Sequence, residues 1–320
     1  MNRLIASLSC DLDDKWSYMK THGDGGWETF PSYLDLIVPR ILSCLKQQDL
    51  PATFFIVGQD AVSERNRNLF RSIAEAGYEV GNHSFRHDPW LHLYSEQEIE
   101  KEMAMAEEHI EEATGQRPVG FRGPGYSISE ATVKELIRRD YLYDATTFPT
   151  FLMPLARLYY FATSNFSSQE KRLRKRLGGR LRDGLRPNKP YWWRLDGKTL
   201  LEIPVTTLPG FKLPLHMSYL FALNVFSPKL ARGYLYLSLR LCRLAGVEPS
   251  IVLHPTDFLG SEDRQGLLFI PGMGLPLEKK LEFVEDVLKR LKDAFSVVTL
   301  REHAAMAARR TTLPMVNPSF

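Results

Sequence analysis

Leu4-Ile-Ala-Ser-Leu-Ser-Cys10, followed at once by Asp11-Leu-Asp13-Asp14, is the stretch that decides the fold of this 320-residue chain. A short run of apolar and small residues of this kind predicts a β-strand buried on both faces. Three carboxylates at the end of such a strand are costly to bury unless they pair or meet a cation. The stretch therefore predicts a buried strand that delivers acidic side chains to a site.

The same succession of a strand and then a helix recurs along the chain. Further strands are predicted at 52–57, 78–81, 119–122, 200–205, 250–253 and 295–300. Helices are predicted at 33–47, 68–75, 95–114, 127–139 and 277–292, two of them opened by the capping boxes Ser95/Glu98 and Ser127/Glu130. Repeated β-then-α units with such apolar strands indicate a parallel α/β fold.

Polar residues that could carry chemistry follow the predicted strands. They are Asp11, His83, Arg122, Asp144 and His254. In a β/α barrel the carboxyl ends of all strands converge on one mouth, where active sites are built. This placement favours a barrel over an open sheet.

His83 and His87 lie four residues apart in the stretch Gly81-Asn-His-Ser-Phe-Arg-His-Asp88. Two imidazoles at this spacing can reach one metal from one face of a turn or helix. Two nitrogens and one carboxylate, with positions left for water and substrate, form the ligand set of a hydrolytic metal site. The carboxylate would come from Asp11, Asp13 or Asp14. Strand alternation directs Asp11 and Asp13 to the same side, and Asp14 would also suit a helix cap.

Five segments in order resemble the motifs of the polysaccharide deacetylase family, carbohydrate esterase family 4. They are Asp11-Leu-Asp13, His83-Ser-Phe-Arg-His87, Phe121-Arg-Gly-Pro-Gly-Tyr126, Tyr143-Asp144 and Val252-Leu-His254-Pro255. The resemblance implies a distorted (β/α) barrel with about seven parallel strands and metal-dependent removal of N-acyl groups from amino sugars. The two acids are adjacent in the commonest form of the first motif; the spaced Asp-Leu-Asp resembles deacylases of lipid-linked or small polar substrates.

The resemblance also implies roles for individual residues. Asp13, His83 and His87 would hold one divalent metal, usually zinc, with cobalt, nickel or iron as alternatives. Asp11 would be the catalytic base and His254 the general acid. Arg122 would orient the base, and Asp144 would keep the imidazole of His254 protonated. Tyr126, through a backbone donor or as part of the site wall, and Asp14 are secondary candidates for contact with the substrate or its oxyanion.

A long insertion interrupts the resemblance. Its first half, 148–166, is apolar and aromatic, and its second half is basic. The cations are Lys171, Arg172, Arg174, Lys175, Arg176, Arg180, Arg182 and Arg186. This pattern is typical of a segment lying on an anionic membrane surface, with a solvated charged helix as the alternative. A second apolar stretch, 211–244, fits either an interfacial segment or a buried barrel helix.

Composition sets the remaining expectations. The net charge of +3 argues against a nucleic-acid partner, and three cysteines at unrelated spacings indicate a reducing compartment. No signal peptide is evident. We expect a single deacetylase-like barrel domain over 1–310, with an insertion over 148–198 and a C-terminal tail over 311–320.

The sequence thus favours a cytoplasmic N-deacylase, peripheral on the inner face of the membrane. Its expected substrate is an acetylated or formylated amino sugar on a polyprenyl-phosphate or glycolipid carrier. Alternatives are a deacetylase of soluble glycans, a hydrolase of a small cyclic amide or ureide, and a carbohydrate-binding pseudo-enzyme.

Overall fold

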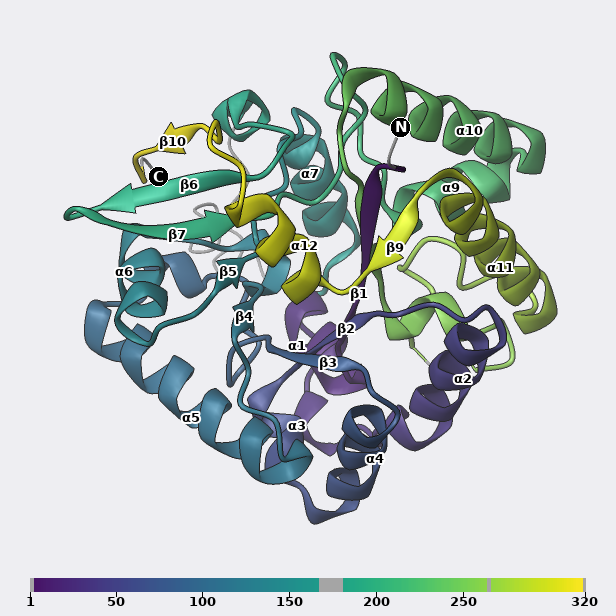
Figure 1. Ribbon diagram of the computed structural model, residues 1–320. Helices are drawn as coiled ribbons and strands as arrows, with labels where there is room; N and C mark the ends of the chain where they lie inside the picture. The colour runs from purple at the N-terminus through teal and green to yellow at the C-terminus, as the bar shows by residue number, and fades with distance from the viewer. Residues whose placement is uncertain (1–2, 167–180, 264–265, 319–320) are drawn as a thin grey trace.

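A mostly parallel β-sheet surrounded by helices forms the body of the protein in a computed structural model, which describes residues 3–166, 181–263 and 266–318 (Figure 1). Seven strands run parallel to their sheet neighbours in the order β7-β5-β4-β3-β2-β1-β8. In chain order they are β1 (Ile5–Leu12), β2 (Thr53–Ile56), β3 (Glu79–Asn82), β4 (Gly120–Phe121), β5 (Tyr143–Asp144), β7 (Lys198–Glu202) and β8 (Ser250–Leu253). The predicted α/β class with seven parallel strands is confirmed.

Three short strands extend this sheet. β9 (Ser296–Val298) pairs with β1, while β6 (Tyr191–Leu195) runs antiparallel to β7 and also pairs with β10 (Met315–Val316). β6 falls inside the expected insertion, and β10 falls inside the expected tail. Both segments therefore contribute to the sheet, and the domain boundaries stay a prediction.

The row of seven parallel strands curls until its first and last members, β7 and β8, approach each other. No strand pair joins β7 to β8 in the described sheet, but the segment that follows β7 crosses this gap. The backbone N–H of Val205 donates to Thr147 O at 2.8 Å, and that of Thr206 donates to Ser250 O at 3.2 Å. The bond between Thr206 and Ser250 thus joins the segment after β7 to the first residue of β8, in keeping with a distorted barrel.

Helices cover the outside of the strands (Figure 1). They are α1 (Lys15–His22), α2 (Leu34–Gln47), α3 (Gly58–Val62), α4 (Glu64–Glu75), α5 (Glu96–Thr114), α6 (Glu130–Arg138), α7 (Met153–Thr163), α9 (Met217–Phe226), α10 (Pro228–Ala245), α11 (Leu277–Ala294) and α12 (Leu300–Ala308). Every residue of β1 is buried, as a strand of a parallel sheet covered on both faces must be.

Helix starts follow their capping chemistry. Ser95 and Glu98 form the predicted capping box at α5. The second predicted box is wrong, because α6 is capped by Ser129, whose hydroxyl accepts from Thr132 N. The hydroxyl of Ser127 instead accepts the backbone N–H of His92 at 2.9 Å.

The predicted insertion is described only in part. α7 occupies its apolar half, whereas six of the eight predicted cations, from Lys171 to Arg180, lie outside the described residues. The stretch 211–244 forms α9 and α10, and one face of α10 is buried through Leu235, Leu239 and Cys242. Among the helices described, none combines the length and apolar character needed to span a bilayer.

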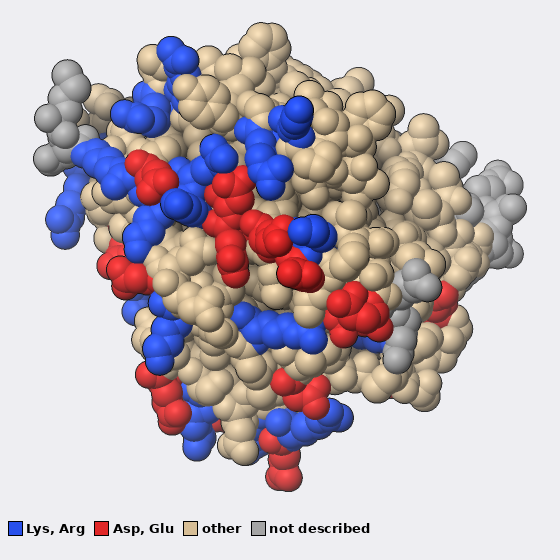
Figure 2. Space-filling model, turned by 90° about the vertical axis from the view of Figure 1, so that its right-hand side faces the viewer, with Lys and Arg blue, Asp and Glu red and all other residues tan. Residues whose placement is uncertain are grey.

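Charges of both signs alternate over the outer helices. Arg232 of α10 and Arg290 of α11 both bind Asp286, at 3.0 Å and 2.8 Å. The face in Figure 2 likewise carries basic and acidic side chains next to each other. This face therefore presents no continuous field of one sign.

Candidate functional site

The polar residues predicted at strand ends meet at one end of the sheet. Asp11 is the second-to-last residue of β1, and Asp13 follows the end of that strand. His83, Arg122 and His254 directly follow β3, β4 and β8. These strands are neighbours or near neighbours in the sheet. Because they are parallel, their carboxyl ends deliver the side chains to one place.

A tight loop after β3 brings His83 and His87 together. The side chain of Asn82 accepts from Ser84 N at 2.8 Å, and the hydroxyl of Ser84 accepts from His87 N at 3.2 Å. His87 has a φ of +53°, a left-handed conformation that is uncommon for a residue with a Cβ. The two imidazoles thus share one site through a turn and not through a helix.

Asp13, His83 and His87 have the geometry of metal ligands. Their ligand atoms all lie within 4.8 Å of one another, with His83 Nε2 and His87 Nε2 at 3.3 Å and 3.0 Å from Asp13 Oδ1. Two ligands on one ion at tetrahedral angles and bond lengths near 2.0–2.1 Å lie about 3.3 Å apart. The buried Asp13 Oδ1 has no hydrogen-bond donor, so the donor set fits a cation.

The protonation states of these groups suit that role. Burial alone would raise the pKa of Asp13, but the adjacent imidazoles of His87 and His83 hold that pKa well below its usual range. Nδ1 of His83 lies 2.6 Å from Arg122 O, an acceptor, so Nδ1 carries the hydrogen. In the neutral imidazole, Nε2 of His83 then carries the lone pair, the arrangement that outer contacts of metal-bound histidines usually fix.

Asp11 is held by a fully buried arginine. Arg122 donates from Nη1 to Asp11 Oδ1 at 2.7 Å and to Ser9 Oγ at 2.8 Å, and from Nε to Ala145 O at 2.9 Å. Its guanidinium also lies over the ring of Phe55. The carboxylate of Asp11 is thereby fixed in one orientation.

His254 approaches Asp11 from β8. Its Nε2 lies 3.8 Å from Asp11 Oδ2, and its backbone N–H donates to Asp257 Oδ2 at 2.8 Å. Asp257 belongs to the 3₁₀ turn Pro255–Phe258 that follows. Sequence reasoning did not single out Asp257, which holds the loop that carries His254.

Asp14 points away from the metal-ligand cluster. Its Oδ1 accepts the backbone N–H of Lys15 at 2.6 Å and of Tyr33 at 3.1 Å, and it caps α1. These contacts match the helix-cap alternative and favour Asp13 as the carboxylate ligand.

Asp144 packs against another carboxyl group. The register of β5 and β7 places it opposite Glu202, and its Oδ1 accepts from the backbone and hydroxyl of Thr146. Burial and the neighbouring Asp144 raise the pKa of Glu202 well above its usual range, so its protonated form persists to higher pH than in an exposed glutamate. Asp144 contacts Thr146 and Glu202 and lies near the charge of Arg122. The role expected for it at His254 stays a prediction.

A cavity of about 230 Å³ opens onto these groups. It is lined by Asp11, Asp13, His83, His87, Tyr126, His216 and His254, together with residues of α1. His216 was missed by sequence reasoning, because it stands alone between leucines and methionine with no partner at a diagnostic spacing. Only the fold brings it to the cavity.

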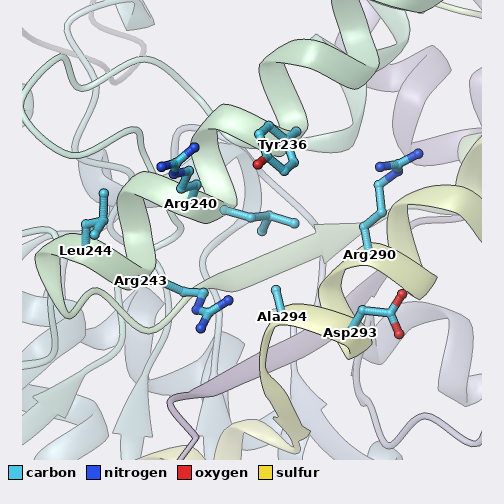
Figure 3. Close-up of a pocket in the computed structure, with 8 residues that line it drawn as sticks. Tyr236, Arg240, Arg243, Leu244, Arg290, Asp293 and Ala294 are labelled. Atoms are coloured by element: carbon cyan, nitrogen blue, oxygen red, sulfur yellow. The ribbon is translucent and has the colours of Figure 1, made fainter.

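A larger hollow between α10 and α11 contains none of these residues. It measures about 590 Å³ and is lined by Tyr236, Arg240, Arg243 and Arg290 among others (Figure 3). Size alone would favour it, but its lining lacks residues from the strand ends. The smaller cavity holds the groups capable of chemistry.

Fold and site together define a class: a parallel α/β protein with metal-ligand and acid–base side chains at the carboxyl ends of its strands. Residues 24–143 match the model of the polysaccharide deacetylase family. This segment is therefore similar to the polysaccharide deacetylase family, in agreement with the resemblance of the sequence motifs.

Individual relatives agree with this family. The chain is 32% identical to a peptidoglycan deacetylase of Helicobacter pylori over 33% of its length and 36% of that protein's. It is 33% identical to a peptidoglycan-N-acetylglucosamine deacetylase of Bacillus cereus over 36% of its length and 41% of that protein's. The chain thus spans about two fifths or less of these relatives.

The whole fold has a counterpart among solved structures. A Mycobacterium smegmatis protein assigned as a polysaccharide deacetylase matches with a TM-score of 0.64 and 21% identity. That match covers 100% of this chain and 96% of the other. The likeness extends the shared fold beyond the segment that the family model matches.

Proposed function

We propose that this protein is a metal-dependent hydrolase that removes an N-acyl group, acetyl or formyl, from an amino sugar. The observation that carries the proposal is the meeting of Asp13 with His83 and His87 beside Asp11 and His254. The similarity to the deacetylase family supports the same reaction class.

Hydrolysis of an amide requires an activated water, a stabilised oxyanion and a protonated leaving amine. A divalent ion held by Asp13, His83 and His87 would lower the pKa of bound water and polarise the carbonyl. Zinc suits this donor set, with cobalt, nickel and iron as alternatives.

The chain's own residues would move the protons. Asp11, fixed by Arg122, is positioned to accept the proton of the attacking water. His254, at the end of the neighbouring strand β8, would donate a proton to the departing amine. An imidazole suits this role because its unperturbed pKa is near 6.5. The 3.8 Å between His254 Nε2 and Asp11 Oδ2 leaves both groups facing the same small volume.

The surroundings of the cavity favour a substrate with a lipid carrier. α7 exposes Leu155, Leu158 and Tyr159, which are 61%, 65% and 50% accessible. The helix is fastened beside the cavity, since Tyr160 donates to the carbonyl of Thr21, a lining residue, and Tyr159 donates to Phe269 O, next to the lining residue Ile270. A group of exposed apolar side chains at a cavity mouth is typical of a membrane or lipid contact.

An amino-sugar polymer is the second candidate substrate. It is favoured by the peptidoglycan named for both relatives. In either case we infer a protein that works peripherally at the inner membrane surface or in the cytoplasm, without a nucleic-acid partner. A small cyclic amide or ureide and a carbohydrate-binding role without catalysis are the remaining alternatives.

The test is turnover by the metal-loaded protein. Four substrates are compared by mass spectrometry: a polyprenyl-phosphate-linked acetamido sugar, its formamido analogue, a soluble N-acetylglucosamine oligomer and a cyclic ureide. We expect the acyl-sized mass loss from an amino sugar, and a loss of roughly 10²-fold or more in rate for Asp11→Asn and His254→Ala, the usual scale for a general base or acid.

His109→Ala, a change on the outer surface of α5, is the matched control and should keep the wild-type rate. Metal content and melting temperature of each variant are measured in parallel. No acyl loss from any amino sugar would refute the deacylase proposal, and normal turnover by either site variant would remove that residue from the mechanism.

A further inference from the structure

Tyr126 and His216 form a hydrogen-bonded pair on the wall of the cavity. Tyr126 Oη lies 2.7 Å from His216 Nε2, and both side chains line the cavity with Asp11 and Asp13. Neither side chain has a role in the reaction as derived above. The question is which of the two donates the hydrogen, because that decides where the other hydrogen points.

The backbone of Tyr126 is already engaged. Its N–H donates to Gly123 O at 3.0 Å within the 3₁₀ turn Pro124–Tyr126. The backbone N–H of Tyr126, expected from the sequence as a donor to the substrate, is thus already used within the turn. The side-chain hydroxyl is the group of Tyr126 that remains to face a substrate.

The second ring nitrogen of His216 fixes its tautomer. The backbone N–H of Ser218 donates to His216 Nδ1 at 3.2 Å, so Nδ1 must carry a lone pair. The hydrogen of a neutral imidazole then resides on Nε2, which donates it to Tyr126 Oη. The hydroxyl hydrogen of Tyr126 consequently cannot point at His216 and is directed elsewhere.

The surroundings keep His216 neutral. Its ring lies among the rings of Tyr126, Phe148 and Tyr219, with centroids 5.8–6.2 Å away, and 5.1 Å from the ring of His254. Burial lowers the pKa of His216 well below its usual range, and the nearby His254 and Arg122 lower it further. Burial and the charge of Asp11 raise the pKa of Tyr126, so its phenol also keeps its hydrogen.

We propose that His216 is a positioning residue that turns the Tyr126 hydroxyl into a hydrogen-bond donor for the acyl oxygen of the substrate. This inference rests on the proposed deacylase function. The acyl oxygen gains negative charge as water adds to the carbonyl carbon, and a pre-oriented donor stabilises that charge. No bond to Tyr126 is formed or broken, since the hydroxyl only donates a hydrogen bond.

The kinetic test uses four variants of the metal-loaded protein. Tyr126→Phe and His216→Phe should each lower kcat by about 10²-fold, the scale for losing one oxyanion donor, with a smaller change in KM. His216→Gln should restore a large part of the rate, because its amide nitrogen can donate from the position of Nε2. Tyr219→Phe is the matched control, since it deletes a hydroxyl from the same aromatic group outside the cavity lining.

A double-mutant cycle separates positioning from packing. If His216 acts through the Tyr126 hydroxyl, His216→Phe should add less than about 3-fold to the loss already caused by Tyr126→Phe. Fully multiplied losses would overturn the inference. An unchanged kcat in Tyr126→Phe, in a preparation whose wild type is active, would overturn it as well.

Nitrogen-15 spectra of histidine-labelled protein test the tautomer without any substrate. We expect His216 to appear as the neutral Nε2–H form at pH 7, and a charged ring or an Nδ1–H form overturns the inference. A wild type inactive on every amino sugar would instead refute the deacylase proposal, and the role of Tyr126 would fall with it. The two failures are therefore distinguishable.

Discussion

Three side chains carry the metal-site prediction at the scale of residues. His83→Ala, His87→Ala and the double variant each remove an imidazole within 3.3 Å of Asp13 Oδ1. We expect the double variant to lose stoichiometric zinc, measured by elemental analysis after dialysis. We also expect it to lose the stabilisation that added zinc gives the wild type, about 2.7 kcal/mol at a free concentration of 100 Kd.

His109→Ala serves as the control, because it removes an imidazole of α5 that packs against Phe85 of the ligand loop but supplies no atom to the ligand cluster. One equivalent of tightly held zinc in the double variant would contradict the ligand assignment. Metal that remains in the single variants but exchanges faster would still agree with it.

The part of the site that could be predicted consists of residues whose separation in the sequence is itself informative. His83 and His87 follow from their separation of four, and Asp13 from the motif resemblance together with strand alternation, which sets it apart from Asp14. The structure brings the ligand atoms of these three residues together. His216 and Asp257 could not be found this way, because their roles depend on which loops meet in space. The orientation of Asp14 likewise depends on Tyr33, a residue nineteen positions along the chain that donates to it.

At the scale of elements, α7 carries the prediction about the substrate carrier. Leu155→Ser with Leu158→Ser removes two exposed apolar side chains without touching the cavity lining. We expect turnover of a polyprenyl-phosphate-linked substrate to fall at least 5-fold at subsaturating concentration, while turnover of a soluble amino-sugar amide stays within 2-fold. Full burial of one leucine side chain in lipid would contribute about 1.5–3 kcal/mol to binding, and this sets the upper limit of the loss for each substitution.

Leu237→Ser with Leu244→Ser on α10 is the matched control, since these leucines are also exposed but lie outside the cavity lining. Equal losses on both substrates would indicate that α7 is structural. No loss on the lipid-linked substrate would remove the carrier from the proposal.

Elements with a clear repeating pattern were predictable, and their boundaries less so. β1, β2 and α5 match the sequence expectations because apolar runs and the Ser95/Glu98 box are local signals. The sequence predicted the cap of α6 at Ser127, two residues before the actual cap at Ser129. The hydroxyl of Ser127 instead accepts the backbone N–H of His92. That contact joins residues 35 positions apart, which a local pattern does not contain.

At the scale of the whole molecule, the buried pair Asp144 and Glu202 links folding stability to pH. The pair joins β5 to β7, and Glu202 also accepts from Thr147 and Trp193. Its raised pKa means that the folded protein holds a proton that the unfolded chain releases above about pH 4.5. This stabilisation is fully present below the unfolded pKa and is lost as pH rises toward the folded one, by up to about 1.4 kcal/mol per pH unit.

Asp144→Asn should flatten that dependence, because an amide then donates to Glu202 in place of the shared proton. The measurement is the free energy of unfolding in urea at pH 6, 7 and 8 for the wild type and the variant. Asp293→Asn, at an exposed carboxylate of α11, provides the control. Identical slopes for the wild type and Asp144→Asn would show that the pair does not share a proton.

Arg122 acts on the two halves of the site through two different parts of itself. Its carbonyl oxygen accepts from His83, and its guanidinium grips Asp11. Every amino acid has this backbone carbonyl, so the hydrogen bond that orients the ring of His83 depends on the position of the backbone after β4. Replacing the side chain at position 122 leaves that acceptor in place. The hydrogen bond to Asp11 is made by the arginine side chain, so it is lost when the residue is replaced. Mutation at position 122 can therefore uncouple the alignment of the base from the geometry of the ligand cluster, and the two need not be lost together in a diverging lineage.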